Sequence, residues 1–296
     1  MRKGKYVVGL GEVLWDVFSG GKKLGGAPAN FAFHASQLGC DAYVVSAVGD
    51  DDLGKQIVDE LDKKGLHHVT PTVHFPTSEV QVRLTDACSA TYEFTDNSSW
   101  DNIPFTADME EIARNTAAVC WGTLAQRSER SSATIAKFLD LVPDDALKIF
   151  DVNIRSNFYS QDLLDDSLKR CNVLKTNEEE IMILWNLVDM HSDRVWDISR
   201  ALLKKYNLRQ VLATWGDEGS YVFLPDNVTS YFDRKHVEVI DTVGAGDSFT
   251  AAYVAATIAG KSVAAAHEFA RKVSAFVCTQ RGAMPLLPEE LKHELG

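Results

Sequence analysis

The fold class is decided by a first stretch in which strands and helices alternate: YVVGL at residues 6–10, PANFAFHASQL at 28–38 and AYVVSAV at 42–48. The two apolar runs predict buried strands, and the segment between them predicts a helix. An amphipathic segment at 53–64 predicts a second helix, which ends at Gly65. Regular alternation of strand and helix is typical of a parallel sheet, because the helix carries the chain back to the starting edge.

The alternation stops between residues 68 and 95, where short polar and apolar segments follow one another without a helix. This pattern predicts an antiparallel flap beside the main sheet, with strands at 69–75, 79–84 and 90–94. Alternation then resumes. The further expected strands are 117–121, 147–152, 173–175, 210–215, 220–224 and 237–240, and the further expected helices are 131–141, 162–171, 178–187, 248–259 and 263–280. We therefore expect one α/β domain over 1–296, with a doubly wound, mainly parallel sheet flanked by helices.

Composition excludes several classes of function. The 30 basic and 42 acidic side chains give a net charge of −12, which disfavours nucleic acid as a partner. Five scattered cysteines without a Cys-x-x-Cys pair predict neither a disulfide framework nor a zinc site. Glu12 and Asp16 interrupt the only apolar stretch near the N-terminus, so we expect no signal peptide, no membrane span and a cytoplasmic location.

The strongest local motif is DTVGAGDSF at 241–249, between a β-like run and an Ala-rich helix. Its glycines allow backbone N–H groups to approach a ligand, and the helix that follows adds the positive end of its dipole, so the motif predicts an anion site. Asp247 at the helix start is either an acidic residue that stabilises the helix or a general base beside a phosphate. No Walker-type motif occurs, and Leu14 occupies the third glycine position of a dinucleotide fingerprint that would begin at Gly9.

A second polar cluster lies near the N-terminus. Glu12 and Asp16 precede the segment GGAPAN at 25–30, in which Pro28 can begin a helix. Asp16 and Asn30 could exchange hydrogen bonds with sugar hydroxyls above the exposed glycine backbone. The alternative is an ordinary turn between a strand and a helix.

Together with DVNIR at 151–155 and NEEE at 177–180, these motifs resemble the ribokinase (pfkB-type) carbohydrate kinase family over nearly the whole chain. GEVLWD at 11–16 followed by GGAPAN is most similar to the fructokinase branch. The resemblance implies a ribokinase-like fold in which residues 12–24 and 68–100 form a β lid over the sugar. It also implies an ATP-dependent sugar kinase, acting on D-fructose at its 6-hydroxyl, with 2-keto-3-deoxygluconate or ribose as alternative substrates. A non-catalytic sugar or nucleotide sensor is the competing reading.

The resemblance also implies roles for individual residues. Asp247 is the expected base, beside an anion hole formed by the N–H groups of Gly244, Ala245 and Gly246. The residues expected to bind the sugar are Asp16, Gly26, Asn30 and Arg155. Those expected to position ATP and hydrated Mg²⁺ are Asn177, Glu180, Thr214, Gly216 and Gly219, with Glu180 on the metal side.

For several other residues the sequence supports two alternative roles. Lys175 either attracts the ATP phosphates or is a solvated lysine at a strand end, and Trp215 either contacts the nucleotide or packs in the core. Phe94 and Trp100 either cover the substrate or pack within the lid and its interface. Residues 280–283, with the loop at Asp241, resemble the region that holds K⁺ in some family members. A homodimer formed through the lid is a further implication.

Overall fold

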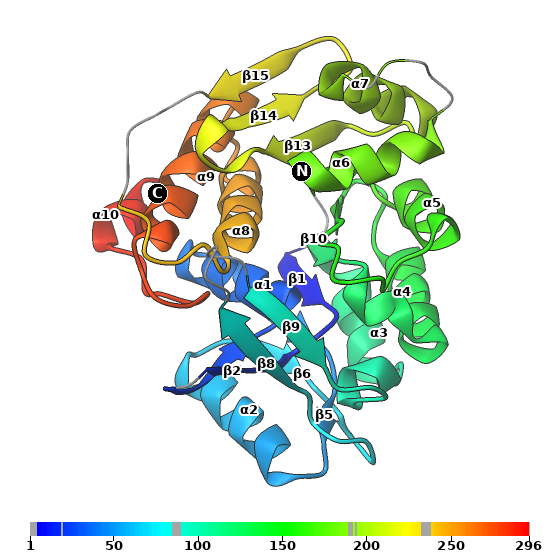
Figure 1. Ribbon diagram of the computed structural model, residues 1–296, viewed down its shortest axis with the longest axis vertical. Coiled ribbons are helices and arrows are strands. Elements are labelled where there is room, and N and C mark those ends of the chain that lie inside the picture. Colours follow the sequence, from blue (N-terminus) through cyan, green and yellow to red (C-terminus); the bar gives the residue numbers. More distant parts are fainter. Residues whose placement is uncertain are drawn as a thin grey trace.

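The structure is a computed structural model that describes residues 5–18, 20–84, 90–188, 192, 194–231 and 238–295. Within these residues, nine strands form one central sheet, and parallel pairing runs from β6 to β13. Its order across the sheet is β15 (Val228–Tyr231), β14 (Ser220–Phe223), β13 (Gln210–Thr214), β12 (Val173–Asn177), β11 (Leu147–Asp151), β10 (Thr116–Trp121), β1 (Tyr6–Leu10), β4 (Asp41–Val45) and β6 (His67–Val69). The predicted doubly wound, mainly parallel sheet is therefore confirmed (Figure 1).

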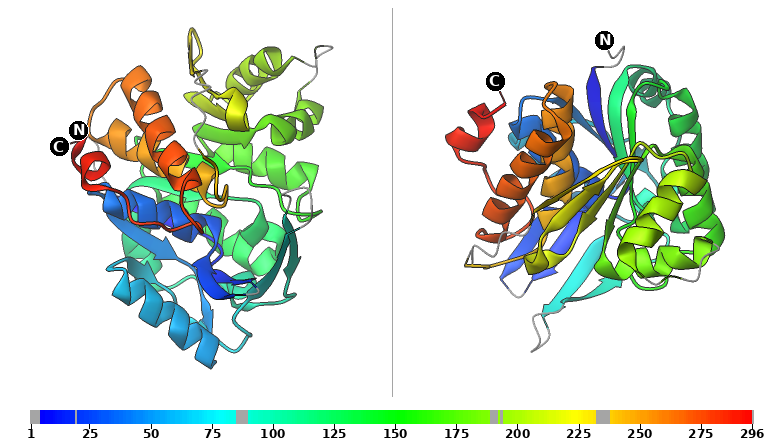
Figure 2. Two further views of the ribbon diagram at one scale, coloured as in Figure 1. Left: turned by 60° about the vertical axis from the view of Figure 1, so that its left-hand side comes forward. Right: turned by 90° about the horizontal axis from the view of Figure 1, so that it is seen from above.

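Helices cover both faces of the central sheet, which Figure 2 shows as a layer between two helical layers. The helices on one face are α1 (Ala27–Gln37), α2 (Asp52–Lys63), α8 (Ala245–Ile258) and α9 (Val263–Cys278). Those on the other face are α3 (Ala107–Arg114), α4 (Glu129–Leu141), α5 (Gln161–Arg170), α6 (Glu178–Leu184) and α7 (Val195–Lys205). A short helix, α10 (Glu289–His293), lies near the C-terminus. No helix in the described ranges is long and apolar enough to cross a membrane.

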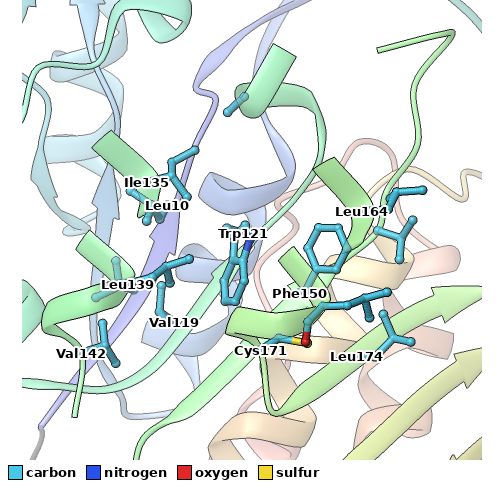
Figure 3. Packing of buried hydrophobic residues seen from close by; sticks show 14 of the residues in the cluster. Leu10, Val119, Trp121, Ile135, Leu139, Val142, Phe150, Leu164, Cys171 and Leu174 are labelled. Atoms are coloured by element: carbon cyan, nitrogen blue, oxygen red, sulfur yellow. The ribbon is translucent and has the colours of Figure 1, made fainter. Parts of the chain in front are cut away.

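Two hydrophobic cores hold these layers together because successive residues of a strand point to opposite faces. In β1, Val7 belongs to the core beneath α1 and α8, whereas Val8 and Leu10 belong to the core beneath α3 to α7. Figure 3 shows part of the second core, where the rings of Trp121 and Phe150 lie 5.9 Å apart. Because the cores hold these strands in place, the polar side chains at the carboxyl ends of the strands also have fixed positions.

A separate four-stranded sheet stands beside the main one in the order β3 (Gly21–Gly25), β2 (Leu14–Phe18), β8 (Glu79–Leu84) and β9 (Ala90–Phe94). The expected strand at 69–75 is not part of it. Residues His67–Val69 form β6, which pairs parallel with β4 in the main sheet, and Thr72–Val73 form β7, which pairs with β5 (Val48–Gly49). Pairing of β2 with β8 is parallel, so the small sheet is mixed rather than purely antiparallel.

Some elements differ from the sequence prediction. Of the strand expected at 237–240, residue 237 lies outside the described residues, and residues 238–240 are not in a strand. The N–H groups of Ile240 and Asp241 instead donate to the carbonyl of Cys278, which ties this segment to the end of α9. Helices α3 and α7, which are rich in charge, and strand β15, which has only four residues, had not been predicted.

Candidate active site

A cavity of about 320 Å³ opens at the carboxyl ends of β1, β11, β12 and β13, between the small sheet and the N-terminus of α8. Open α/β sheets bind ligands at this edge. Ten residues predicted from the sequence line the cavity: Asp16, Gly26, Asn30, Arg155, Asn177, Glu180, Thr214, Gly244, Gly246 and Asp247. Segments more than 200 residues apart in the sequence therefore meet in one place, as the sugar, phosphate and nucleotide motifs were expected to do.

Three of the predicted residues do not line this cavity: Ala245, Gly216 and Gly219. Gly216 begins a 3₁₀ turn directly after Trp215, and Gly219 follows its end, so both lie one turn beyond Thr214. Ala245 differs from the prediction for a geometric reason. Its N–H group donates to the carbonyl of Thr242 at 3.2 Å, and it is therefore already paired.

The first turn of α8, from Gly244 to Asp247, has the geometry of an anion cradle. Gly244 caps the helix at φ +78°, where a Cβ would also lie 2.8 Å from Ala283, so the position requires glycine. No side chain caps the helix, and among the described residues the N–H groups of Gly246 and Asp247 have no acceptor. Unpaired amides at a helix N-terminus favour a bound anion, and the Asp247 amide takes the place predicted for Ala245.

The hydrogen bonding and the burial of Asp247 both suit the role of base that the sequence predicts. Its carboxylate accepts a hydrogen bond from Nδ2 of Asn30 at 2.8 Å, which joins the phosphate motif to the sugar motif. Burial raises the pKa of Asp247 to about 7, and the nearby charge of Asp151 adds to this effect, whereas the hydrogen bond from Asn30 opposes it. A carboxylate with a pKa near neutrality accepts a proton far more readily than an exposed aspartate does.

On the sugar side, two buried oxygen atoms lack a hydrogen-bond partner: Oδ1 of Asn30 and Oε2 of Glu12. Oε1 of Glu12 accepts from the N–H of Ala27 at 3.3 Å, and burial raises the pKa of Glu12 to about 7. Burial also raises the pKa of Asp16 to about 6, an effect that the charge of Arg155 opposes. Because unpaired buried acceptors are costly, the wall is suited to a ligand that carries hydroxyl donors.

Gly25 makes room for Asp16. A Cβ at residue 25 would lie 2.1 Å from Oδ2 of Asp16, so any side chain there would displace the carboxylate. Gly26 has φ +107°, and a Cβ on it would lie 2.4 Å from the carbonyl oxygen of Glu12. The two glycines therefore let the loop before α1 close around the two acidic residues.

Asn177 and Glu180 form a capping box at the start of α6. Each backbone N–H donates to the other's side chain at 2.9 Å, and the second carboxylate oxygen of Glu180 accepts from the N–H of Ile154 at 3.1 Å. Both oxygens of Glu180 are thus engaged by backbone amides. No group of three or more His, Cys, Asp or Glu side chains in the described part of the chain is arranged to hold a metal. These residues fit an Mg²⁺ ion that keeps most of its water ligands, as Mg²⁺ does beside phosphates.

Several residues around the cavity had been left undecided or unassigned. Lys175 lines the cavity and is only 4% exposed, so the reading as a solvated strand-end lysine is wrong. Asp151 and Glu12 also line it, and each stood inside or beside a recognised motif without an assigned role. Their position at the carboxyl end of a buried strand, Asp151 as its last residue and Glu12 two residues beyond it, was the signal that could have identified them.

The aromatic residues are also placed by the structure. Trp215 packs edge-on against Tyr221 at 5.0 Å within a hydrophobic core, as the plainer reading held. Phe94 lines the cavity, whereas Trp100 is fully buried outside it. At the proposed cation loop, Asp241 accepts from the N–H groups of Val243 at 3.0 Å and Gly282 at 2.8 Å, which holds the two loops together.

Comparisons with known proteins agree with this geometry. The family model for pfkB family carbohydrate kinases matches residues 5–290. The fructokinase of Salmonella typhimurium is 27% identical, over 94% of this chain and 95% of that protein, and the ribokinase of Arabidopsis thaliana is 29% identical, over 90% and 69%. A crystal structure of an uncharacterized sugar kinase from Pyrococcus horikoshii superimposes with a TM-score of 0.84 at 25% identity, covering 98% of each chain. The chain belongs to the pfkB family of carbohydrate kinases.

Proposed function

We propose that this kinase transfers the γ-phosphate of ATP to the 6-hydroxyl of D-fructose. Membership of the family supports a phosphotransferase that acts on a carbohydrate. Relatives named fructokinase at about 27% identity favour fructose, while a ribokinase also lies within the same range of similarity. Among solved structures, a fructokinase with bound ATP from Xylella fastidiosa shares the fold.

In the proposed reaction, Asp247 accepts the proton of the sugar hydroxyl as the hydroxyl oxygen forms a bond to the γ-phosphorus. The bond between that phosphorus and the oxygen that bridges to the β-phosphate breaks, and ADP leaves. Asn30 orients the Asp247 carboxylate through their 2.8 Å hydrogen bond. The free amides of Gly246 and Asp247 stabilise the negative charge of the transferred group.

The proposal includes Mg²⁺, which when bound would neutralise charge on the phosphates. Asn177 and Glu180 are the residues placed to position it through its water ligands, with Asp151 on the same cavity wall. The proposal also includes K⁺, which the loop at Asp241 and the loop at residues 280–283 would hold.

The observation that carries the choice of substrate class is the charge of the cavity wall. Five carboxyl groups line it (Glu12, Asp16, Asp151, Glu180 and Asp247) against two cations, Arg155 and Lys175. The positive charge of Arg155 acts on four of these carboxyl groups at once. It lowers the pKa values of Glu12, Asp16, Asp151 and Asp247. A neutral sugar supplies hydroxyl donors to the unpaired oxygens, whereas a sugar acid would add a further carboxylate to an acidic wall.

The test is ADP release with MgATP and a panel of fructose, ribose, glucose, mannose, tagatose, 2-keto-3-deoxygluconate and fructose 6-phosphate. We expect the highest kcat/KM for fructose, and a higher kcat/KM for the neutral hexoses than for the sugar acid. The highest kcat/KM for 2-keto-3-deoxygluconate would move the substrate to a sugar acid. Binding of sugar and ATP without turnover on any sugar would favour the sensor.

We also propose that the small sheet formed by β2, β3, β8 and β9 acts as a lid. Leu14 and Asp16 from β2, Val80 from β8 and Phe94 from β9 line the cavity, so this sheet forms one of its walls. A wall that closes over the sugar excludes water and favours transfer to the sugar over hydrolysis of ATP. The proposal has two further parts. Two copies of the chain form a homodimer through this sheet, and the kinase is located in the cytoplasm.

A further inference from the structure

Lys175 is a buried cation, and none of the described residues provides it with a counter-ion in direct contact. It lies in β12 near the carboxyl end and is 4% exposed. Its one hydrogen bond runs from Nζ to the carbonyl of Thr176 at 3.5 Å, which is long, and no carboxylate of the described residues lies within 4.0 Å of it. A buried ammonium is costly unless an anion faces it.

The register of the sheet determines where this ammonium points. Lys175 is opposite Asp151 in β11 and Leu212 in β13, and Val173, two residues earlier, belongs to the core beneath α1 and α8. Because residues two apart share a face of a strand, Lys175 faces the N-terminus of α8. A Cβ on Gly246 would lie 3.7 Å from Nζ, so the ammonium stands directly beside the anion cradle.

The carboxylates nearby do not substitute for an anion in contact. The charge of Lys175 lowers the pKa values of Asp151, Glu180 and Asp247, although burial raises all three. Glu180 is held by the backbone amides of Asn177 and Ile154, and Asp247 is held by Asn30. Two of the three carboxylates, those of Glu180 and Asp247, are therefore held by other donors, while the ammonium lies beside the cradle.

We propose that Lys175 is a catalytic residue whose ammonium contacts the γ-phosphoryl group of the bound nucleotide. The inference rests on the proposed function, because it requires a nucleoside triphosphate in the cavity. The amides of Gly246 and Asp247 approach this group from α8 and Lys175 approaches it from β12. Phosphoryl oxygens would thereby receive a positive charge in addition to that of Arg155, which acts on four carboxyl groups of the wall.

The test measures binding rather than turnover. Isothermal titration calorimetry with Mg²⁺ compares ADP with the β,γ-imido analogue of ATP, in the wild type and in Lys175→Met. We expect Kd for the triphosphate analogue to rise by about 10- to 100-fold, the loss of a charge-assisted hydrogen bond, and Kd for ADP to rise by less than about threefold. Lys148→Met is the matched control, since Lys148 lies in the neighbouring strand β11 but does not line the cavity.

Equal losses for the two nucleotides, or no loss for either, would overturn the inference and leave the proposed function standing. A wild type that binds neither nucleotide would overturn both. Lys175→Gln is the second variant, which keeps a polar side chain of similar length if the methionine variant does not fold. The same selective loss for the triphosphate analogue is expected there, and thermal unfolding establishes that each variant is folded.

Discussion

The hydrogen bond between Asn30 and Asp247 joins two motifs that are 217 residues apart in the sequence. It also opposes the effect of burial on Asp247, whose pKa is raised to about 7. A raised pKa means that the carboxylate becomes protonated, and would then lose the proposed function as a base, as the pH falls through that value. The activity of this kinase is therefore expected to fall below neutral pH through the chemistry of one residue.

Asn30→Leu removes the donor and should raise the pKa of Asp247 further. We expect the inflection in the dependence of log kcat on pH to move upward from about 7, because the carboxylate loses the bond that favours its charged form. The measurement is kcat at saturating sugar and MgATP over a series of pH values. Asp16→Asn is the control, since it lies on the sugar wall without contacting Asp247, and its inflection should stay in place. An unchanged inflection in Asn30→Leu would contradict this account of Asp247.

Gly25→Ala should impair sugar binding selectively. The new Cβ would lie 2.1 Å from Oδ2 of Asp16, so the carboxylate must move away from the cavity. We expect KM for the sugar to rise by about tenfold or more, the loss of a hydrogen bond to a charged group, with little change in KM for ATP. Gly20→Ala in the turn of the same hairpin is the control, because nothing lies within 4 Å of a Cβ there. Equal KM values for the sugar in the two variants would argue against a role for Asp16.

At the scale of elements, one buried arginine joins the small sheet to the main body. Arg127 forms hydrogen bonds of 2.7 Å with both carboxylate oxygens of Asp101, and it also donates to the carbonyl of Thr95 just after β9. Its guanidinium lies 4.2 Å from the ring centroid of Trp100 and 4.7 Å from that of Phe158. The end of the small sheet is thus attached to the segment before α4 by charge and by stacking.

Arg127→Met should destabilise the protein strongly, because it leaves Asp101 buried without its partner. We expect the free energy of unfolding to fall by about 3–5 kcal/mol, as when one member of a buried ion pair is removed. Urea unfolding followed by tryptophan fluorescence measures the change. Arg130→Met, at an exposed position in the first turn of the following helix α4, should change the stability by no more than about 0.5 kcal/mol. A loss in Arg127→Met as small as in this control would show that the ion pair contributes little.

The elements also show what the sequence could predict. Strands such as β1 and helices such as α9 were found because their apolar periodicity is strong and their burial nearly continuous. The segment 69–75 was assigned to the wrong sheet, since short strands carry no sign of their partner. Most of the motif residues that the sequence indicated line one cavity, but the paired state of the Ala245 amide depends on one hydrogen bond to Thr242, which only the three-dimensional structure reveals.

The whole molecule carries a net charge of −12 and must still bind an anionic nucleotide. A surface of this net charge does not favour long-range attraction of an anion, so we expect local groups to supply the attraction: the amides of α8, the buried Lys175 and, in the proposed function, a hydrated Mg²⁺. Composition disfavoured nucleic acid as a partner but gave no information on this local reversal of charge. The local reversal of charge follows from the order of strands, because that order brings β12, which carries Lys175, beneath α8.

The proposed dimer is also a property of the whole molecule. The small sheet has β3 and β9 at its edges, and an edge strand can pair with a second copy. Sedimentation equilibrium should therefore give twice the chain mass of 32.7 kDa at micromolar concentration. A mass of one chain over the whole concentration range would exclude dimerisation through the lid.

The central claim is that Asp247 acts as the base in phosphoryl transfer from ATP to a sugar, and ³¹P NMR tests it most directly. With MgATP and fructose, we expect the wild type to convert the γ-phosphate signal into that of a sugar phosphomonoester. Asp247→Asn should do so about 10²- to 10⁴-fold more slowly, while it still binds the nucleotide. A wild-type rate in Asp247→Asn, or the release of inorganic phosphate alone by the wild type, would contradict the account.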